Sequence, residues 1–186
     1  ITDPSPAAEK VLATAAKLGI DRVKLGYYRY APFGTLAKQM DEVRKRLAAI
    51  AKLVQSPGVL PCVHIHSGSY IPSHGTLLFE LLKDFSPSEV GAYVDPLHMT
   101  LEGGGAGWQQ GLDLLAPWIR LVAIKNFVYV PARRDKLGQK RWEAPVVPIG
   151  DGIAPVPDVK AALTKSGHTG TFARPGHKKD KHSRTE

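Results

Sequence analysis

The chain has 186 residues, of which 43% are hydrophobic, and a formal net charge of +8. This length suits one domain with an ordinary core, and the one cysteine, Cys62, excludes an internal disulfide. No run approaches the roughly 18 apolar residues of a membrane span. The first residues have neither the basic segment nor the apolar segment of a signal peptide. We therefore expect a cytoplasmic protein without a membrane partner, whose native N-terminus lies upstream because the chain does not begin with Met.

The basic residues gather in three segments, residues 133–136, 140–141 and 178–181. Charges in loops and tails are typical of a solvated surface, so we expect no nucleic-acid partner. The alternative for a few of these cations is the phosphate of a small substrate, which one or two positive groups can hold.

Helical and strand patterns alternate along the first third of the chain. Ser5 and Pro6 are a capping residue and a first-position proline, and they predict a helix that ends at Gly19. Its expected apolar stripe is Val11, Leu12, Ala15 and Leu18. A strand is expected over residues 22–26. Apolar residues three and four positions apart then predict a long helix over residues 35–55.

The same alternation continues to residue 172. The further expected strands are residues 59–65, 91–95, 119–125, 145–149 and 171–172, and the further expected helices are residues 74–83, 108–115 and 157–166. Ser86 and Glu89 have the spacing of a capping box and predict one more helical turn. The glycine run at 103–105 favours a flexible loop over a phosphate cradle, because no Lys-Ser or Lys-Thr pair follows it.

Six strands that read apolar throughout and are separated by helices predict an α/β fold with a parallel sheet covered on both faces. A closed (β/α)8 TIM barrel needs eight strands and about 250 residues. We therefore expect an incomplete barrel of about six βα units, with the N-terminal strands missing. The alternative is a doubly wound domain, which needs a glycine-rich phosphate turn after its first strand, and residues 26–30 do not provide one.

Metal-capable side chains stand at the ends of two of these strands. His64 and His66 end one strand, and Asp95 and His98 follow the next. If the strands are parallel neighbours, these ends lie side by side, and the two-residue period of a strand puts His64 and His66 on one face. The pattern predicts a divalent-metal or catalytic site, with hydrogen-bonded structural histidines as the alternative reading.

Four segments in order, residues 63–68, 90–98, 114–126 and 148–153, resemble the xylose isomerase-like TIM barrel family of sugar phosphate isomerases and epimerases. The resemblance runs from about residue 4 to residue 172. It implies a sugar or sugar phosphate as substrate, a divalent metal (Mn, Mg, Co or Zn) at the mouth of the barrel, and proton transfer next to a sugar carbonyl.

The resemblance also implies roles for particular residues. Asp95 matches the metal-binding aspartate of the fifth strand, and His98 matches the histidine three residues later. His64 stands where the fourth strand of the family has a glutamate, and imidazole can replace it as a softer ligand. The implied metal ligands are therefore Asp95, His98 and His64. The implied catalytic groups are His64, His66 and Lys125, with a histidine as the base.

Two expected ligands are absent from the sequence. Ala123 stands two residues before Lys125, where the family has a histidine, and no carboxylate follows Phe172 until Asp180. We therefore expect a partial barrel domain over residues 1–174 and a basic, disordered tail over 175–186 that diverges from a native eighth loop.

Substrate-binding candidates lie near the same expected mouth. Tyr27 and Arg29 follow a strand, Asn126 belongs to the motif that carries the resemblance, and Trp142 could stack on a sugar. Three function classes compete: a metal-dependent isomerase or epimerase, a degenerate barrel that binds sugar without turnover, and an apurinic-site endonuclease. The last needs more metal ligands than the chain offers. A homodimer would cover the open edges of the sheet.

Overall fold

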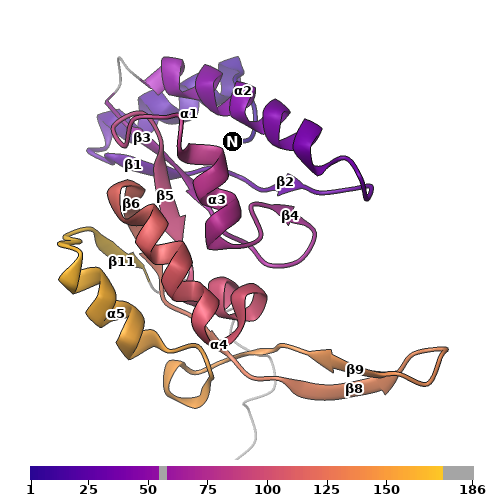
Figure 1. Ribbon diagram of the computed structural model, residues 1–186. Helices are drawn as coiled ribbons and strands as arrows, with labels where there is room; N and C mark the ends of the chain where they lie inside the picture. Colours follow the sequence, from indigo (N-terminus) through magenta and orange to yellow (C-terminus); the bar gives the residue numbers. More distant parts are fainter. Residues whose placement is uncertain (55–57, 174–186) are drawn as a thin grey trace, which may run out of the picture.

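The computed structural model describes residues 1–54 and 58–173, so the expected tail over 175–186 lies outside the described residues. Five parallel strands form one sheet (Figure 1). In sheet order they are β1 (Arg22–Lys24), β3 (Leu60–His64), β5 (Gly91–Val94), β6 (Ile119–Ala123) and β11 (Thr171–Ala173). Each pairs in parallel with the next, so all the carboxyl ends meet at one edge.

Five α-helices follow one another along one side of this sheet (Figure 1). They are α1 (Pro6–Lys17), α2 (Leu36–Val54), α3 (Gly75–Leu82), α4 (Pro96–Leu115) and α5 (Val156–Lys165), and each packs beside the next in chain order. Helices α3 and α4 cross closely, because a Cβ on Gly75 would lie 2.6 Å from the Cα of Gly111. A curled parallel sheet with helices outside it is a half-barrel, which confirms the predicted incomplete (β/α)8 fold.

Alternation along the strands separates two sets of side chains. In β3, Val63 belongs to the large core cluster that the sheet shares with α2 to α5, whereas Cys62 belongs to a small cluster on the opposite face. Tyr93 of β5 and Ala123 of β6 join Cys62 on that opposite face. Because the side-chain period is two residues, His64, Asp95 and Lys125 fall on this inner face as well.

Short antiparallel pairs extend the half-barrel. They are β2 (Tyr28–Arg29) with β4 (Tyr70–Ile71), β7 (Asn126–Phe127) with β10 (Val146–Val147), and β8 (Val130–Arg134) with β9 (Lys140–Glu143). Two 3-10 turns, η1 (Ala116–Trp118) and η2 (Ile149–Asp151), complete the elements. The β8–β9 hairpin projects from the body (Figure 1) and carries part of the basic charge.

The predicted parallel strand over 145–149 is wrong. Only Val146 and Val147 of this segment form a strand, and they pair antiparallel with β7, while β11 lies directly beside β6. The parallel sheet therefore has five strands among the described residues instead of the six predicted. The physical reason is that Pro145 and Pro148 flank the segment and have no N–H group for a longer ladder.

The predicted loop at the glycine run is reduced to a kink at one non-helical residue, Gly104. Helix α4 begins at Pro96, far before the expected start at 108, and it passes through residues 103–105 with a kink at Gly104, where φ is 64°. Its start is favoured by Pro96 at the first position and by the Asp95 side chain, which caps the helix. The capping box at Ser86 and Glu89 forms its hydrogen bond, from Ser86 N to Glu89 Oε2 at 2.8 Å, but only a turn follows.

The stripe predicted for α1 needs correction as well. Leu12 and Ala15 are buried, together with Ala8, but Val11 is 51% exposed and Leu18 is 70% exposed. This helix stands at the end of the row and packs on one side only, against Val54 and Val59. In the part of the chain that the structure describes, no helix is both long and apolar enough to cross a membrane.

Adjacent residues of α1 test this packing. We expect Leu12→Ala to lower the free energy of unfolding by about 2–5 kcal/mol, because it leaves a cavity at a side chain with no exposure. Val11→Ala should change it by less than about 0.5 kcal/mol. Urea denaturation followed by circular dichroism measures both values, and similar losses for the two variants would contradict the packing.

Candidate functional site

Asp95 is the centre of a polar cluster at the carboxyl edge of the sheet. It directly follows β5 and caps α4, and its side chain has no exposed surface. The Leu97 backbone N–H donates to Asp95 Oδ1 over 3.1 Å. A helix N-terminus favours a negative charge, so the local fold already stabilises this carboxylate.

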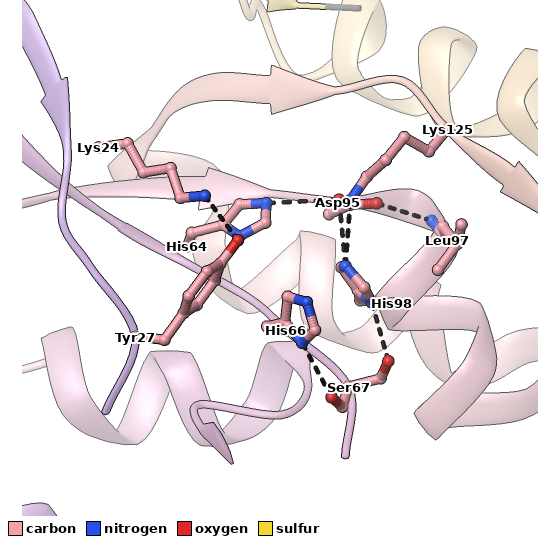
Figure 2. A network of polar contacts seen from close by, with 9 residues as sticks. All are labelled: Lys24, Tyr27, His64, His66, Ser67, Asp95, Leu97, His98 and Lys125. Atoms are coloured by element: carbon pink, nitrogen blue, oxygen red, sulfur yellow. Dashed lines mark hydrogen bonds and ion pairs between the residues drawn. The ribbon is translucent and has the colours of Figure 1, made fainter. Parts of the chain in front are cut away.

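Three nitrogens from three different parts of the chain approach the other oxygen of Asp95 (Figure 2). Asp95 Oδ2 lies 2.6 Å from Lys125 Nζ, 3.3 Å from His64 Nε2 and 3.6 Å from His98 Nε2. None of these contacts has hydrogen-bond geometry at Oδ2, so they act mainly through charge and dipole. The carboxylate is held by an ion pair with Lys125 and flanked by two imidazoles.

Burial controls the protonation of the groups around Asp95. Burial alone would raise the pKa of Asp95, but His64, His98 and Lys125 together bring that pKa below its ordinary value. Burial lowers the pKa of His64, and it lowers the pKa of His98 to about 3. At neutral pH the site therefore contains a charged Asp95 and two neutral imidazoles, with Lys125 as the counter-ion.

Hydrogen bonds decide which nitrogen of two imidazoles carries the proton. The Lys125 ammonium donates to His98 Nε2 over 3.1 Å, so the proton of His98 is on Nδ1, which lies 2.8 Å from Ser67 Oγ. His66 Nδ1 lies 3.0 Å from the carbonyl oxygen of Ser67, which can only accept. His66 therefore donates from Nδ1, so the neutral tautomer of this ring has its lone pair on Nε2.

Aromatic rings surround the half-buried His66. The rings of His98, Tyr70 and Tyr27 have their centroids 4.2, 4.6 and 4.7 Å from its own. The Tyr27 hydroxyl accepts a hydrogen bond of 2.6 Å from Lys24 Nζ. The Tyr27 and Tyr70 rings give His66 an aromatic wall beside the charged cluster, and Figure 2 shows the part of it that Tyr27 forms.

The structure brings together six of the residues predicted from sequence: Tyr27, His64, His66, Asp95, His98 and Lys125. Asn126 is buried next in sequence to Lys125, but its amide donates to the Ile149 and Ala154 carbonyls and accepts from two backbone N–H groups. Its hydrogen-bonding capacity is thus used inside the protein.

The other two predicted substrate-binding residues lie further out. The Arg29 guanidinium stands 5.3 Å from the centre of the Tyr70 ring, and the Tyr70 ring in turn contacts His66. Trp142 is 57% exposed on the β8–β9 hairpin, with Lys140 over its ring. The substrate-binding roles of Arg29, Trp142 and Asn126 stay predictions.

The sequence reasoning missed four residues of the site. Ser67 joins His66 to His98, Lys24 and Tyr70 contact the aromatic wall, and Glu102 Oε1 accepts from Gly68 N over 2.6 Å. A signal existed for Glu102, because it lies four residues after His98 on the same helix. Lys24 ends a strand as His64 does. Nothing in the pattern marked the Ser67 hydroxyl.

The cluster does not fit a divalent metal as it stands. His64 Nε2 and His98 Nε2 approach one oxygen of Asp95, which makes them the donors that the resemblance implies. However, among residues 1–54 and 58–173 no three His, Cys, Asp or Glu side chains are arranged to hold a metal ion. Lys125 Nζ stands between Asp95 and His98, and Ala123 supplies no donor. The metal-binding role of the three residues stays a prediction.

Polar side chains gathered at the carboxyl ends of barrel strands are typical of the active sites of TIM-barrel enzymes. The model of the family described as "Xylose isomerase-like TIM barrel" matches residues 7–174. The chain therefore belongs to the xylose isomerase-like TIM barrel family. No curated protein matches the sequence significantly.

Solved structures share the same fold at low sequence identity. A xylose isomerase domain protein from Planctomyces limnophilus is 17% identical with a TM-score of 0.69, covering 91% of this chain and 57% of its own. The IOLI protein with a bound zinc atom is 14% identical with a TM-score of 0.71, covering 90% and 58%. A D-psicose 3-epimerase studied with D-fructose is 16% identical with a TM-score of 0.64, covering 89% and 53%. The chain thus spans somewhat more than half the length of these neighbours.

The Asp95–Lys125 ion pair makes a stability prediction. We expect Lys125→Met to lower the free energy of unfolding by about 2–4 kcal/mol, because it leaves a buried carboxylate without a counter-ion. The double variant with Asp95→Asn should recover at least about 1 kcal/mol of the summed losses. Lys24→Met removes an exposed charge at the end of β1, beside Tyr27, and should cost less than about 0.5 kcal/mol. Equal losses for Lys125→Met and Lys24→Met in urea denaturation would show that the pair is not a buried one.

Proposed function

We propose that the carboxyl-edge site binds a small sugar or sugar phosphate and transfers a proton next to its carbonyl group, as an isomerase or epimerase does. One observation carries the proposal: the His66 ring, whose Nδ1 donates to the Ser67 carbonyl, lies within a half-buried aromatic wall beside the buried Asp95–Lys125 pair. Family membership supports it, because structural neighbours include proteins named as D-psicose 3-epimerase and D-tagatose 3-epimerase-like.

His66 is the base in this proposal. Its Nδ1–H donates to the Ser67 carbonyl, and this hydrogen bond orients the ring. In the neutral ring the lone pair is then on Nε2, the nitrogen that does not contact Ser67. His64 and His98 are less suited, because His64 Nε2 faces Asp95 and both nitrogens of His98 are engaged. Nε2 of His66 removes the proton from the carbon beside the carbonyl, which leaves an enediolate, and the imidazolium, whose proton exchanges with solvent, returns a proton to a carbon of that enediolate.

The surrounding residues suit a sugar ligand. The rings of Tyr27 and Tyr70 offer apolar surface beside His66, and the Tyr27 hydroxyl and Lys24 offer polar groups next to it. Arg29, which lies over the Tyr70 ring, is placed to receive the phosphate of a sugar phosphate. The cytoplasmic location and the homodimer expected from the sequence stay predictions.

A divalent ion, Mn, Mg, Co or Zn, is the cofactor that the family implies, and Asp95, His98 and His64 would be its donors. When bound, such an ion polarises a carbonyl oxygen. Because the donor set does not fit it, no step of this proposal runs through the ion. The same misfit, with Ala123 in place of a histidine, favours a second candidate function, a barrel that binds sugar without turnover.

Hydrogen exchange separates these two functions. We expect the protein to exchange the hydrogen next to the carbonyl of at least one ketose, aldose or their phosphates with deuterium from D2O, as measured by proton NMR. His66→Gln should slow this exchange at least roughly 100-fold with the fold intact, because the base is lost.

His168→Gln is the matched control. His168 precedes β11 and contacts Phe172, and it belongs to none of the elements that form the cluster, so its replacement should leave the exchange rate unchanged. Line broadening of a sugar without deuterium exchange would support the non-catalytic barrel. Neither broadening nor exchange with the whole panel would refute the proposed function.

A further inference from the structure

We propose that the Lys125 ammonium is a built-in cation that takes the place of a divalent metal at Asp95 and His98. The two residues that best match metal ligands of the family are the two that this one nitrogen contacts, at 2.6 Å and 3.1 Å. The cluster is thereby closed to a metal ion unless Lys125 moves away.

The donor atoms of Asp95 and His98 are already engaged. The lone pair of His98 Nε2 accepts a hydrogen bond from Lys125, while Nδ1 donates to Ser67. Asp95 Oδ1 accepts from Leu97 N at the start of α4, and Oδ2 forms the ion pair with Lys125. Lys125 Nζ lies 2.6 Å from Oδ2 and 3.1 Å from Nε2 (Figure 2), so a metal ion bound by both atoms would share their immediate surroundings with the ammonium.

The charge balance of the cluster points the same way. Asp95 is its one buried carboxylate among the described residues, and the nearby Glu102 is exposed and bonded to the Gly68 backbone. One ammonium neutralises one carboxylate. A divalent ion added to Lys125 would leave this low-dielectric site with a net charge of about +2, which is strongly unfavourable.

The sequence departs from its family at the matching place. Lys125 and Ala123 point to the same face of the β6 segment, and Ala123 is fully buried next to Tyr93 and Cys62. The position where the family has a histidine is therefore filled by a methyl group that packs in the inner cluster. The loss of that ligand and the ammonium at Asp95 are two changes with one physical result, a site neutralised by the protein itself.

This inference rests on the proposed function only where it gives Lys125 a role toward substrate. There the ammonium, 17% exposed at its side chain, stabilises the negative charge that develops on the sugar oxygen when His66 removes the proton. A monocation in this role leaves the reaction independent of added metal, so proton exchange should be unchanged in EDTA.

Zinc binding tests the inference without any sugar. We expect isothermal titration of the whole chain with ZnCl2 to show weak binding, and Lys125→Met to bind Zn2+ at least roughly tenfold more tightly, because the variant frees both donors. Lys24→Met is the matched control, since it removes a charge at the end of β1, beside Tyr27, that makes no contact with Asp95. It should change the Zn2+ affinity less than about threefold. Adding Asp95→Asn to Lys125→Met should abolish the gain.

Tight Zn2+ binding by the unaltered chain that His98→Gln abolishes would overturn the inference, and so would a Lys125→Met variant without any gain in affinity. If Lys125→Met does not fold, the unaltered chain and His98→Gln decide alone: equal weak affinities support a closed site. Failure of the proposed function appears separately, as a chain that neither binds nor exchanges any sugar whatever its zinc affinity.

Discussion

The site depends on the burial of one charge. Asp95 has no exposed surface, and transferring an isolated carboxylate from water into such a place costs several kcal/mol. The fold offsets this cost with the N-terminus of α4, the Lys125 ammonium and the nearby Nε2 of His64. The protonation state of the cluster therefore follows from where the chain buries Asp95.

The parallel half-barrel makes this burial possible. Strands β3, β5 and β6 end at one edge, so His64, Asp95 and Lys125, although far apart in the sequence, come within a few ångströms of one another. Val63 and its counterparts on the other face are sealed by the helices, which fixes the register and hence the direction of every inner side chain. Ser67 then connects the loop after β3 to α4 through His98.

The parts of the fold that repeat a simple physical pattern could be predicted from the sequence. Continuous apolar runs mark the strands, and the two-residue period places His64 and His66 on one face. The break at Gly104 follows the local preference of glycine for positive φ, whereas the short antiparallel pairing at 146–147 could not be predicted, because it depends on the tertiary contact with β7. The β8–β9 hairpin was missed for a related reason, since its strands are charged and exposed and have no apolar alternation.

The candidate site shows the same limit. Asp95, His98 and His64 were identified by their places at strand ends, but their spacing does not reveal which cation stands among them. Lys125 resembles an ordinary residue at the end of a strand until the structure puts its Nζ at 2.6 Å from Asp95. That distance distinguishes a metal centre from a cluster that the protein neutralises itself.

A crystal structure grown with excess manganese, with anomalous data collected, would decide which cation neutralises Asp95. We expect Lys125 Nζ to remain in contact with Asp95 Oδ2 and His98 Nε2, and no anomalous peak to lie near either atom. A manganese peak about 2.2 Å from Asp95 Oδ2, with the Lys125 side chain turned away, would contradict the assignment of Lys125 as the resident cation.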